Sequence, residues 1–246
     1  MGLTLHHRLI APAGTTARGA AALVRRLHAR AEEAAAAGRV ARVLPVSAER
    51  EDLERFASAW LARPLPDDPE TTVGVSVPPD AGWIFPVELG ADCELLWLGL
   101  CRYPAWVRYD GRRVATELAE RWRLEGFCKT QYASLHGWPH FRRCHVAAVD
   151  LLGAARGLGL QVKILDEGGY WPGRRVGELR GRLERMNGVV AALAGALKDA
   201  DDGADGGPAV ESPIFRHPQF ERIEADGAAR AGATVDEAVK LLRGRR

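Results

Sequence analysis

The side chains best suited to chemistry are gathered in one short stretch, which begins at Asp166 and ends at Trp171. It contains two acids, two glycines, a tyrosine and a tryptophan. It follows the apolar run of residues 160–165 and precedes a long amphipathic segment. A loop that follows a buried strand is a frequent position for binding and catalytic groups. We therefore take this loop as the candidate functional site.

His145 is the candidate general base for this loop. It lies in a predicted helix, on the same face as Phe141 and Leu152, and is expected to point inward. Asp166 or Glu167 could then orient the imidazole for proton transfer. This arrangement suggests a hydrolase or transferase, with a divalent metal left open. The alternative is a core histidine with one hydrogen bond, beside an Asp-Glu-Gly-Gly turn that has no catalytic role.

Two features limit the chemistry that this loop can carry. Asp166 and Glu167 are adjacent, and neighbours in an extended chain point to opposite faces, so they form an acid-base pair only if the turn begins at Asp166. His140 and Cys144 are one helical turn apart, near His136 and His145, and this spacing suits metal ligands. No second ligand pair with zinc-like spacing accompanies them. We therefore assign no metal ligands, and the cofactor stays unknown.

A binding role is the interpretation that the sequence favours. The chain contains no GxxxxGK[ST] phosphate loop, no GxGxxG after a strand, no GxSxG and no HExxH. We therefore expect a protein that binds a small molecule or a protein partner near the 166–171 loop, with the hydrolase or transferase as the alternative. The expected ligand-binding residues are Lys129, Gln131, Tyr170, Trp171 and Arg174.

Composition excludes several other classes. The chain has 246 residues, of which 34 are basic and 32 acidic, and its net charge is +2. This balance provides no overall attraction for nucleic acid. The apolar runs are far shorter than the roughly 20 residues of a membrane helix, and no signal peptide is read, so we expect a soluble protein without a membrane partner. The four cysteines form no CxxC pair, which favours reduced thiols and a cytoplasmic location.

The elements that must position these groups predict an α+β fold with a mixed sheet. Residues 1–63 have a β-α-β-α pattern, which is similar to part of a ferredoxin-like plait. A proline-rich connector at residues 64–70 is the best internal boundary. The elements expected before it are strands at residues 3–10 and 39–46, a helix capped by Thr15 or Thr16 and ended by Gly38, and a helix from Ser47 to Leu61.

Residues 70–198 are expected to form the body that contains the site. Its first part is predicted to be an antiparallel meander, with strands at residues 73–77, 83–89, 94–101 and 105–109. The turn Asp110-Gly111 ends this meander. A helix is predicted over residues 114–122.

A βαβ unit follows the meander and brings the candidate groups together. Its predicted parts are a strand at residues 127–134, a helix at residues 139–156 and a strand at residues 160–165. The two strands of such a unit run in the same direction, so their carboxyl ends lie at one edge of the sheet. The loops after them should therefore lie side by side, at the edge where open α/β sheets place ligands.

The long helix after the loop is predicted by its apolar periodicity. Apolar residues recur at steps of three and four from Val176 to Leu197. This stripe should pack across the sheet, and a homodimer through the same helix is the alternative. Residues 199–210 have the composition of an acidic linker, and residues 211–246 form a C-terminal extension whose Ile214, Phe215 and Phe220 could dock on the body.

Three segments of this chain resemble a family of uncharacterised bacterial proteins. They are the start Met-Gly-Leu-Thr-Leu-His, the run Lys-Thr-Gln-Tyr-Ala from Lys129, and the run from Asp166 to Trp171 that leads into Met186 and Asn187. The resemblance covers most of residues 1–198 and implies no activity. It implies only that these segments belong together.

Overall fold

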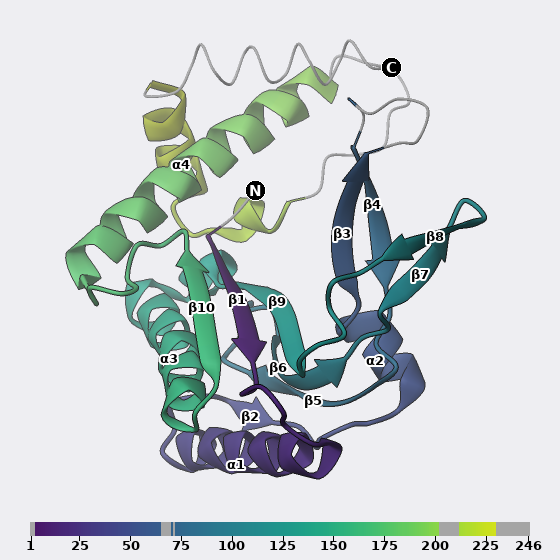
Figure 1. Ribbon diagram of the computed structural model, residues 1–246. Helices are drawn as coiled ribbons and strands as arrows, with labels where there is room; N and C mark the ends of the chain where they lie inside the picture. Colours follow the sequence, from purple (N-terminus) through teal and green to yellow (C-terminus); the bar gives the residue numbers. More distant parts are fainter. Residues whose placement is uncertain (1–2, 65–69, 71, 202–211, 230–246) are drawn as a thin grey trace.

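The computed structural model describes residues 3–64, 70, 72–201 and 212–229 (Figure 1). The α+β class that the sequence predicts is confirmed. The strands are β1 (Thr4–Ile10), β2 (Arg42–Val43), β3 (Ala59–Pro64), β4 (Thr72–Val77), β5 (Ala81–Glu88), β6 (Leu96–Arg102), β7 (Trp106–Tyr109), β8 (Arg112–Ala115), β9 (Arg123–Lys129) and β10 (Gln161–Asp166). The helices are α1 (Ala17–Ala36), α2 (Arg50–Phe56), α3 (Trp138–Gly157) and α4 (Val176–Asp201), with 3-10 helices η1 (Gln131–His136) and η2 (Pro213–Arg216).

The centre of the structure is a six-stranded sheet in the order β10-β1-β9-β6-β5-β2. Neighbouring strands in this sheet pair antiparallel. Because β9 and β10 are both antiparallel to β1, they run in the same direction with β1 between them. The predicted common direction of these two strands is confirmed. The adjacent parallel pair expected in a mixed sheet is wrong, because the N-terminal strand separates its two members.

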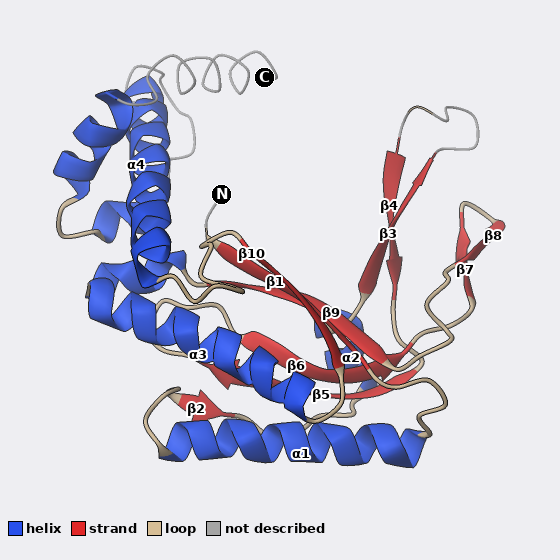
Figure 2. Ribbon diagram, turned by 60° about the vertical axis from the view of Figure 1, so that its left-hand side comes forward, coloured by secondary structure: helices blue, strands red, loops and turns tan. Residues whose placement is uncertain are grey.

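The order of elements in the sheet defines a plait. β1, α1, β6, β9, α3 and β10 form a β-α-β-β-α-β unit of two split βαβ pairs, which is the ferredoxin-like arrangement. Figure 2 shows α1 and α3 on one face of the sheet. The elements from β2 to β5 are inserted between α1 and β6, and β5 and β2 extend the sheet. Residues 1–63 therefore supply only β1 and α1 to the plait.

Local sequence explains the first helix well. Thr16 caps α1 by accepting a hydrogen bond from the Gly19 N–H at 3.1 Å. The buried positions of the helix recur at steps of three and four, as an amphipathic face requires, and Gly38 with φ of 69° follows its end. The predicted cap and end of this helix are confirmed.

Two predicted helices differ from the structure because strand pairing takes over their residues. α2 ends at Phe56, and the following residues form β3, which pairs with β4 from Ala59–Val77 to Pro64–Thr72. The helix predicted at residues 114–122 is wrong. β8 occupies residues 112–115 and pairs with β7 across the turn Asp110-Gly111, where both residues have positive φ. The connector predicted as a boundary thus joins two paired strands; its residues 65–69 lie outside the described part of the chain.

The two faces of the sheet are covered unequally. α1 and α3 pack on one face around a large core that includes Leu27, Leu98 and Phe141. On the opposite face, α2 and β5 contribute to a smaller core around Ile84 and Tyr103. No helix of the described residues covers that opposite face over β10, β1 and β9 (Figure 2). This uncovered area lies between α4 and the β3-β4 hairpin.

The C-terminal part of the described chain packs against α4. Ile214 is fully buried against Val190, Ala191 and Ala194, and Phe215, Phe220 and Ile223 pack around this cluster. The predicted docking of this segment is confirmed. Residues 202–210 of the predicted linker and residues 230–246 lie outside the described part of the chain. None of the described helices is long and apolar enough to span a membrane.

Candidate functional site

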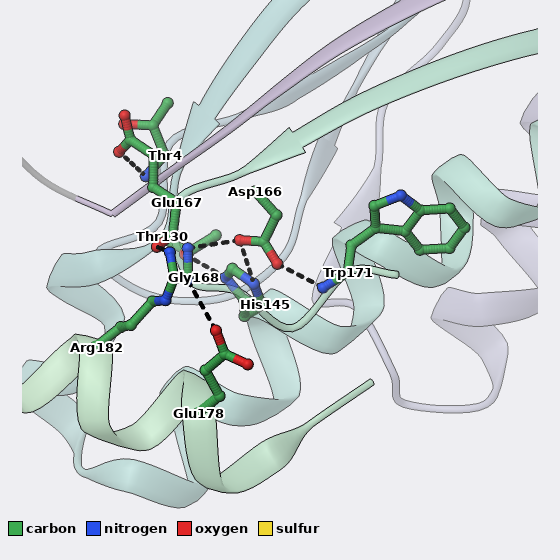
Figure 3. A network of polar contacts seen from close by, with 9 residues as sticks. All are labelled: Thr4, Thr130, His145, Asp166, Glu167, Gly168, Trp171, Glu178 and Arg182. Atoms are coloured by element: carbon green, nitrogen blue, oxygen red, sulfur yellow. Dashed lines mark hydrogen bonds and ion pairs between the residues drawn. The ribbon is translucent and has the colours of Figure 1, made fainter. Parts of the chain in front are cut away.

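The two candidate loops meet at one edge of the sheet, on either side of β1. Leu5 of β1 pairs with Asp166 at the end of β10 and with Cys128 near the end of β9. β9 ends at Lys129, five residues earlier than the predicted strand end, and η1 follows. Figure 3 shows the side chains that this edge collects. β1 lies between β9 and β10, yet the loops that follow these two strands still lie close together.

His145 and Asp166 form the centre of a buried polar cluster, which we define as Thr130, His145, Asp166 and the backbone of residues 168–171. The His145 Nε2 lies 3.3 Å from the Asp166 Oδ1, and neither side chain has exposed surface. This contact has the distance of an ion pair but lacks the alignment of a hydrogen bond. On the other side of the ring, Thr130 Oγ1 lies 2.9 Å from His145 Nδ1. The imidazole is therefore held from both sides.

The carboxylate of Asp166 is occupied by the loop that follows it. Its Oδ1 accepts the N–H of Gly168 at 2.7 Å and its Oδ2 accepts the N–H of Trp171 at 2.8 Å (Figure 3). Burial raises the pKa of this carboxyl, but the His145 imidazole and the two N–H groups outweigh burial and hold the pKa below its usual range. The carboxylate thus acts as an internal cap for the turn.

Glu167 points away from this cluster, as expected for neighbours in an extended chain. Its Oε2 accepts the N–H of Thr4 at 2.9 Å, and its Oε1 lies 3.6 Å from His6 Nε2. Its backbone carbonyl accepts a hydrogen bond from Arg182 of α4 at 3.1 Å. Glu167 therefore fastens the end of β10 to β1 and α4, and it is not brought together with His145.

Both glycines of the loop are required by close packing. A Cβ on Gly168 would lie 2.7 Å from Leu179 Cδ1 and 2.9 Å from His145 Cε1. Gly169 has φ of 68°, and a Cβ there would meet Arg182 and Glu178 of α4 within 2.8 Å. The Gly-Gly pair thus lets α4 close tightly over the loop, which leaves no room beside the imidazole.

Two of the predicted ligand-binding residues, Gln131 and Lys129, lie in different environments. Gln131 is fully buried, where its Oε1 accepts the N–H of Leu3 at 3.0 Å and its Nε2 donates to Asn187 at 2.9 Å. Lys129 lies apart from it, 3.4 Å from a carboxylate oxygen of Glu94. The structure therefore does not bring Lys129 and Gln131 to one binding surface.

The aromatic residues of the loop pack against α3 rather than around a cavity. Tyr170 is buried and its ring stands edge-on to His145, with centroids 6.2 Å apart. Arg174 pairs with Asp150 of α3 and lies 5.7 Å from the Tyr170 ring centroid. Trp171 is covered by Arg156 at 5.0 Å. These contacts close the loop from the outside.

Metal ligands are not gathered at this edge. Among the described residues, no group of three or more histidine, cysteine or acidic side chains has the geometry to hold a metal ion. His140 Nε2 lies 3.6 Å from Cys144 Sγ, while His136 instead pairs with Asp92 at 2.8 Å. Within the polar cluster, the side-chain oxygen and nitrogen atoms of Thr130, His145 and Asp166 are already engaged in contacts with one another or with the loop, so none of them is left to bind an ion.

A large cavity lies on the uncovered face of the sheet. We call it the sheet-face cavity; its volume is about 970 Å³. A second cavity of about 830 Å³ lies between α4, the start of α3 and residues 217–227. Neither His145 nor Asp166 lines either of them. The principal residues of the sheet-face cavity are His6, Trp60, Trp97, Phe127, Lys163 and Leu165.

Strand register explains how the sheet-face cavity obtains its lining. His6 pairs with Leu165 on one side and with Phe127 on the other, which forms a row across three strands. The next row on the same face, two residues further along β1, consists of Lys163, Arg8 and Glu125. Sequence reasoning did not select these residues as a site. The sequence signal that could have identified this face is the alternation in residues 4–10, where Leu5 and Leu9 are buried while His6 and Arg8 are not.

His7 is an unusual buried group at this cavity. Its Nε2 lies 3.0 Å from the Trp97 carbonyl, to which it donates, and its Nδ1 has no hydrogen-bond partner among the described residues. Burial lowers its pKa to about 4, against the effect of the Trp97 carbonyl. A Cβ on Gly126 would lie 3.0 Å from this ring, so a larger residue there would require the ring to shift. The ring is therefore neutral near pH 7.

No protein-family model matches the chain, and neither curated proteins nor solved structures show significant similarity to it. This result is consistent with the resemblance to an uncharacterised family. Function must therefore be argued from the geometry of the chain itself.

Proposed function

We propose that this chain is a ligand-binding protein whose site is the sheet-face cavity, and that its ligand is a small organic anion with a flat apolar body. The observation that carries this proposal is the row of Leu165, His6 and Phe127, which faces outward on a sheet whose opposite face carries α1 and α3. A cavity of about 970 Å³ has the size of sites that take small molecules.

Exposed apolar surface supports an apolar body for the ligand. Trp60 is 73% exposed, Leu165 66% and Phe127 53%, although all three belong to strands. Large apolar side chains grouped in a concave area mark interaction sites. Trp97 adds a ring that is held by stacking on Phe56, with centroids 4.1 Å apart. A rigid ring in the wall favours a flat partner, because stacking costs little side-chain entropy.

Charge favours an anion over a cation. Each acid that lines the cavity already has a basic partner: Glu54 pairs with Arg50, Glu94 with Lys129, and Glu125 with Arg8. In contrast, Lys163 and Arg55 line the cavity without an ion-pair partner among the described residues. A carboxylate, sulfonate or phosphate on the ligand would satisfy them.

The buried polar cluster has a positioning role in this proposal. A hydrolase or transferase would need substrate within hydrogen-bond reach of His145, yet its side chain and that of Asp166 have no exposed surface. Their hydrogen bonds instead order the loop beside β1, and Glu167 extends the order to His6 at the cavity. We therefore place the ligand on the sheet face rather than beside the 166–171 loop.

We further propose a cytoplasmic, bacterial protein. The four cysteines are free thiols, which suits a reducing compartment. The homodimer through the helix from Val176 to Leu197 stays a prediction. Part of the apolar stripe that suggested this dimer packs within the same chain. Leu179 and Leu183 join the main core, and Val190 contacts Ile214.

The probe for this site is anilinonaphthalene sulfonate, a flat apolar anion whose fluorescence rises on binding. We expect saturable binding of one molecule per chain. The double variant Phe127→Ser with Leu165→Ser should weaken binding about tenfold, because it removes roughly 1.4 kcal/mol of apolar contact. Lys163→Gln should weaken it about threefold through loss of one exposed charge contact.

Trp106→Ser is the matched control, because Trp106 is 42% exposed on the β7-β8 hairpin and does not line the cavity. It should bind the probe like the wild type. Near-ultraviolet circular dichroism shows that each variant keeps its packed core. Unchanged affinity in the double variant would refute the proposal, as would loss of binding in Arg185→Ala, because Arg185 is exposed and lines the second cavity but not the sheet-face cavity.

A further inference from the structure

The uncovered sheet face presents two rows of side chains that differ in chemistry. Both rows cross β10, β1 and β9. We call the first the apolar row; it consists of Leu165, His6 and Phe127. We call the second the charged row; it consists of Lys163, Arg8 and Glu125. Two residues of a strand span about 7 Å, so the floor of the sheet-face cavity offers ring contacts and charge at about this separation.

Two rings of the apolar row are open on neighbouring strands. The centroids of the His6 and Phe127 rings are 6.2 Å apart, and about half of each side chain is exposed. Their strands, β1 and β9, are the two central strands of the plait. Aromatic side chains open on a four-stranded sheet stack bases in RNA recognition, and every base has a face that can stack. The apolar row is therefore suited to a nucleobase.

The charged row has more basic groups at hand than acidic ones. Glu125 accepts hydrogen bonds from Arg8, at 3.0 Å, and from Arg123. Lys163 lies directly across from Arg8 in the strand register, is exposed, and has no ion-pair partner among the described residues. Because one acid is shared by two arginines, Lys163 adds a positive charge that nothing nearby balances. Lysine binds phosphate as a point charge, so this end of the cavity is suited to a phosphate.

The separation of the two rows distinguishes between classes of flat anion. In a one-ring aryl carboxylate the charge is attached to the ring, so stacking on the apolar row would hold the charge near that row. In a nucleotide the ribose separates the base from the 5′-phosphate, which suits rows about 7 Å apart. The cavity volume of about 970 Å³ also has room for base, sugar and phosphate together.

We propose that the ligand of the sheet-face cavity is a single nucleotide, whose base stacks on His6 and Phe127 and whose 5′-phosphate pairs with Lys163. This inference rests on the proposed function, since it names the class of ligand for the same cavity. Charge favours one nucleotide over a nucleic-acid strand. The cavity lining has as many acids as lysines and arginines, and the net charge of the chain is only +2. The lining thus provides no continuous basic track for a row of phosphates.

The probe for this proposal is adenosine 5′-monophosphate, titrated into the full-length protein by isothermal titration calorimetry. We expect one molecule to bind per chain and to displace anilinonaphthalene sulfonate. Adenosine, which lacks the phosphate, should bind about threefold more weakly. Ribose 5-phosphate, which lacks the base, should bind at least about tenfold more weakly.

Two variants test the two ends of the nucleotide separately. Phe127→Ala should weaken the binding of both adenosine 5′-monophosphate and adenosine about tenfold, because it removes a stacking ring. Lys163→Gln should weaken the binding of adenosine 5′-monophosphate about threefold and leave that of adenosine unchanged, because only the former has a phosphate. Arg185→Gln is the matched control and should bind like the wild type, since Arg185 is exposed and lines the second cavity only.

The proposal is overturned if adenosine 5′-monophosphate does not bind at millimolar concentration, if ribose 5-phosphate binds equally well, or if Lys163→Gln weakens adenosine to the same extent. A single-stranded RNA of about ten nucleotides that binds more than about tenfold more tightly would overturn it in favour of a strand. Anilinonaphthalene sulfonate separates this proposal from the proposed function. If that probe binds and the variant Phe127→Ser with Leu165→Ser weakens it, absent nucleotide binding refutes only the nucleotide.

Discussion

The buried polar cluster and the sheet-face cavity differ in whether their side chains are accessible to a ligand. The buried polar cluster contains a histidine, an acid and a glycine turn, yet its contacts are internal. The sheet-face cavity contains side chains of ordinary type, yet these are open to a ligand. The comparison teaches that residue type alone does not make a site. A group acts on a ligand only when part of its bonding capacity is free and accessible.

The closed region has a clear structural purpose. Asp166 accepts the buried N–H of Gly168 and the partly buried N–H of Trp171, which would otherwise lack this acceptor. Glu167 does the same for the N–H of Thr4. Leaving such a group without a partner costs about 1–3 kcal/mol. The cluster therefore holds the first strand, the last strand and α4 in one arrangement.

The largest expected effect comes from breaking the closed region. Asp166→Ala should lower the free energy of unfolding by about 4 kcal/mol, because it removes the charged partner of His145 and leaves the N–H groups of Gly168 and Trp171 without an acceptor. Phe127→Ser on the open face should change it by less than about 0.5 kcal/mol. Urea unfolding followed by circular dichroism measures both. A small effect of Asp166→Ala would show that the cluster is not structural and would reopen the enzyme alternative.

The next effect concerns pH and the buried ring beneath the open face. The pKa of His7 falls from 6.5 in the unfolded chain to about 4 when folded. Above pH 6.5 the full contribution of neutral His7 is present, and it is lost as pH falls through about 4. The loss is at most about 3 kcal/mol.

Urea unfolding of the wild type and of His7→Gln between pH 7 and pH 4 measures this contribution. The glutamine can still donate to the Trp97 carbonyl but does not titrate. The difference between the two proteins should change across the window. Parallel pH dependence of wild type and variant would contradict the assignment to His7.

The smallest expected effect tests how tightly the closed region is packed. Gly168→Ala should destabilise the protein by about 2 kcal/mol, because its Cβ would contact Leu179 and His145 at under 3.0 Å. Gly177→Ala, in the first turn of α4, is the matched control, since nothing lies within 4 Å of its Cβ. It should be neutral or stabilise by about 0.5 kcal/mol. Equal melting temperatures for both variants would mean that the loop can shift to accommodate the added methyl group at residue 168.

Parts of the fold followed from local patterns. The cap at Thr16, the periodicity of α1 and α4, and the turn at Asp110 were predicted because they depend on residues close in sequence. The helix predicted over residues 114–122 failed for the opposite reason. Val114 pairs with Val107 of β7, and this cross-strand contact outweighs the local preference.

The candidate site was predicted only in part. The sequence placed His145 and Asp166 together, because a crossover helix returns the second strand in the direction of the first. It did not predict that Lys129 and Gln131 would diverge, which depends on β9 ending at Lys129 and η1 turning Gln131 inward. Nor did it find the sheet-face cavity, whose lining comes from strands with unremarkable sequences.

The sequence by itself determined the α+β class, the ends of several helices and the common direction of β9 and β10, since short-range periodicity and capping encode these features. Tertiary structure alone decided that β1 lies between those two strands, that the 166–171 loop is closed and that the opposite sheet face is open. The physical reason is that each depends on contacts between distant segments, such as the N–H of Thr4 with Glu167 and of Leu3 with Gln131. Local patterns carry no record of which distant partner will satisfy a buried group.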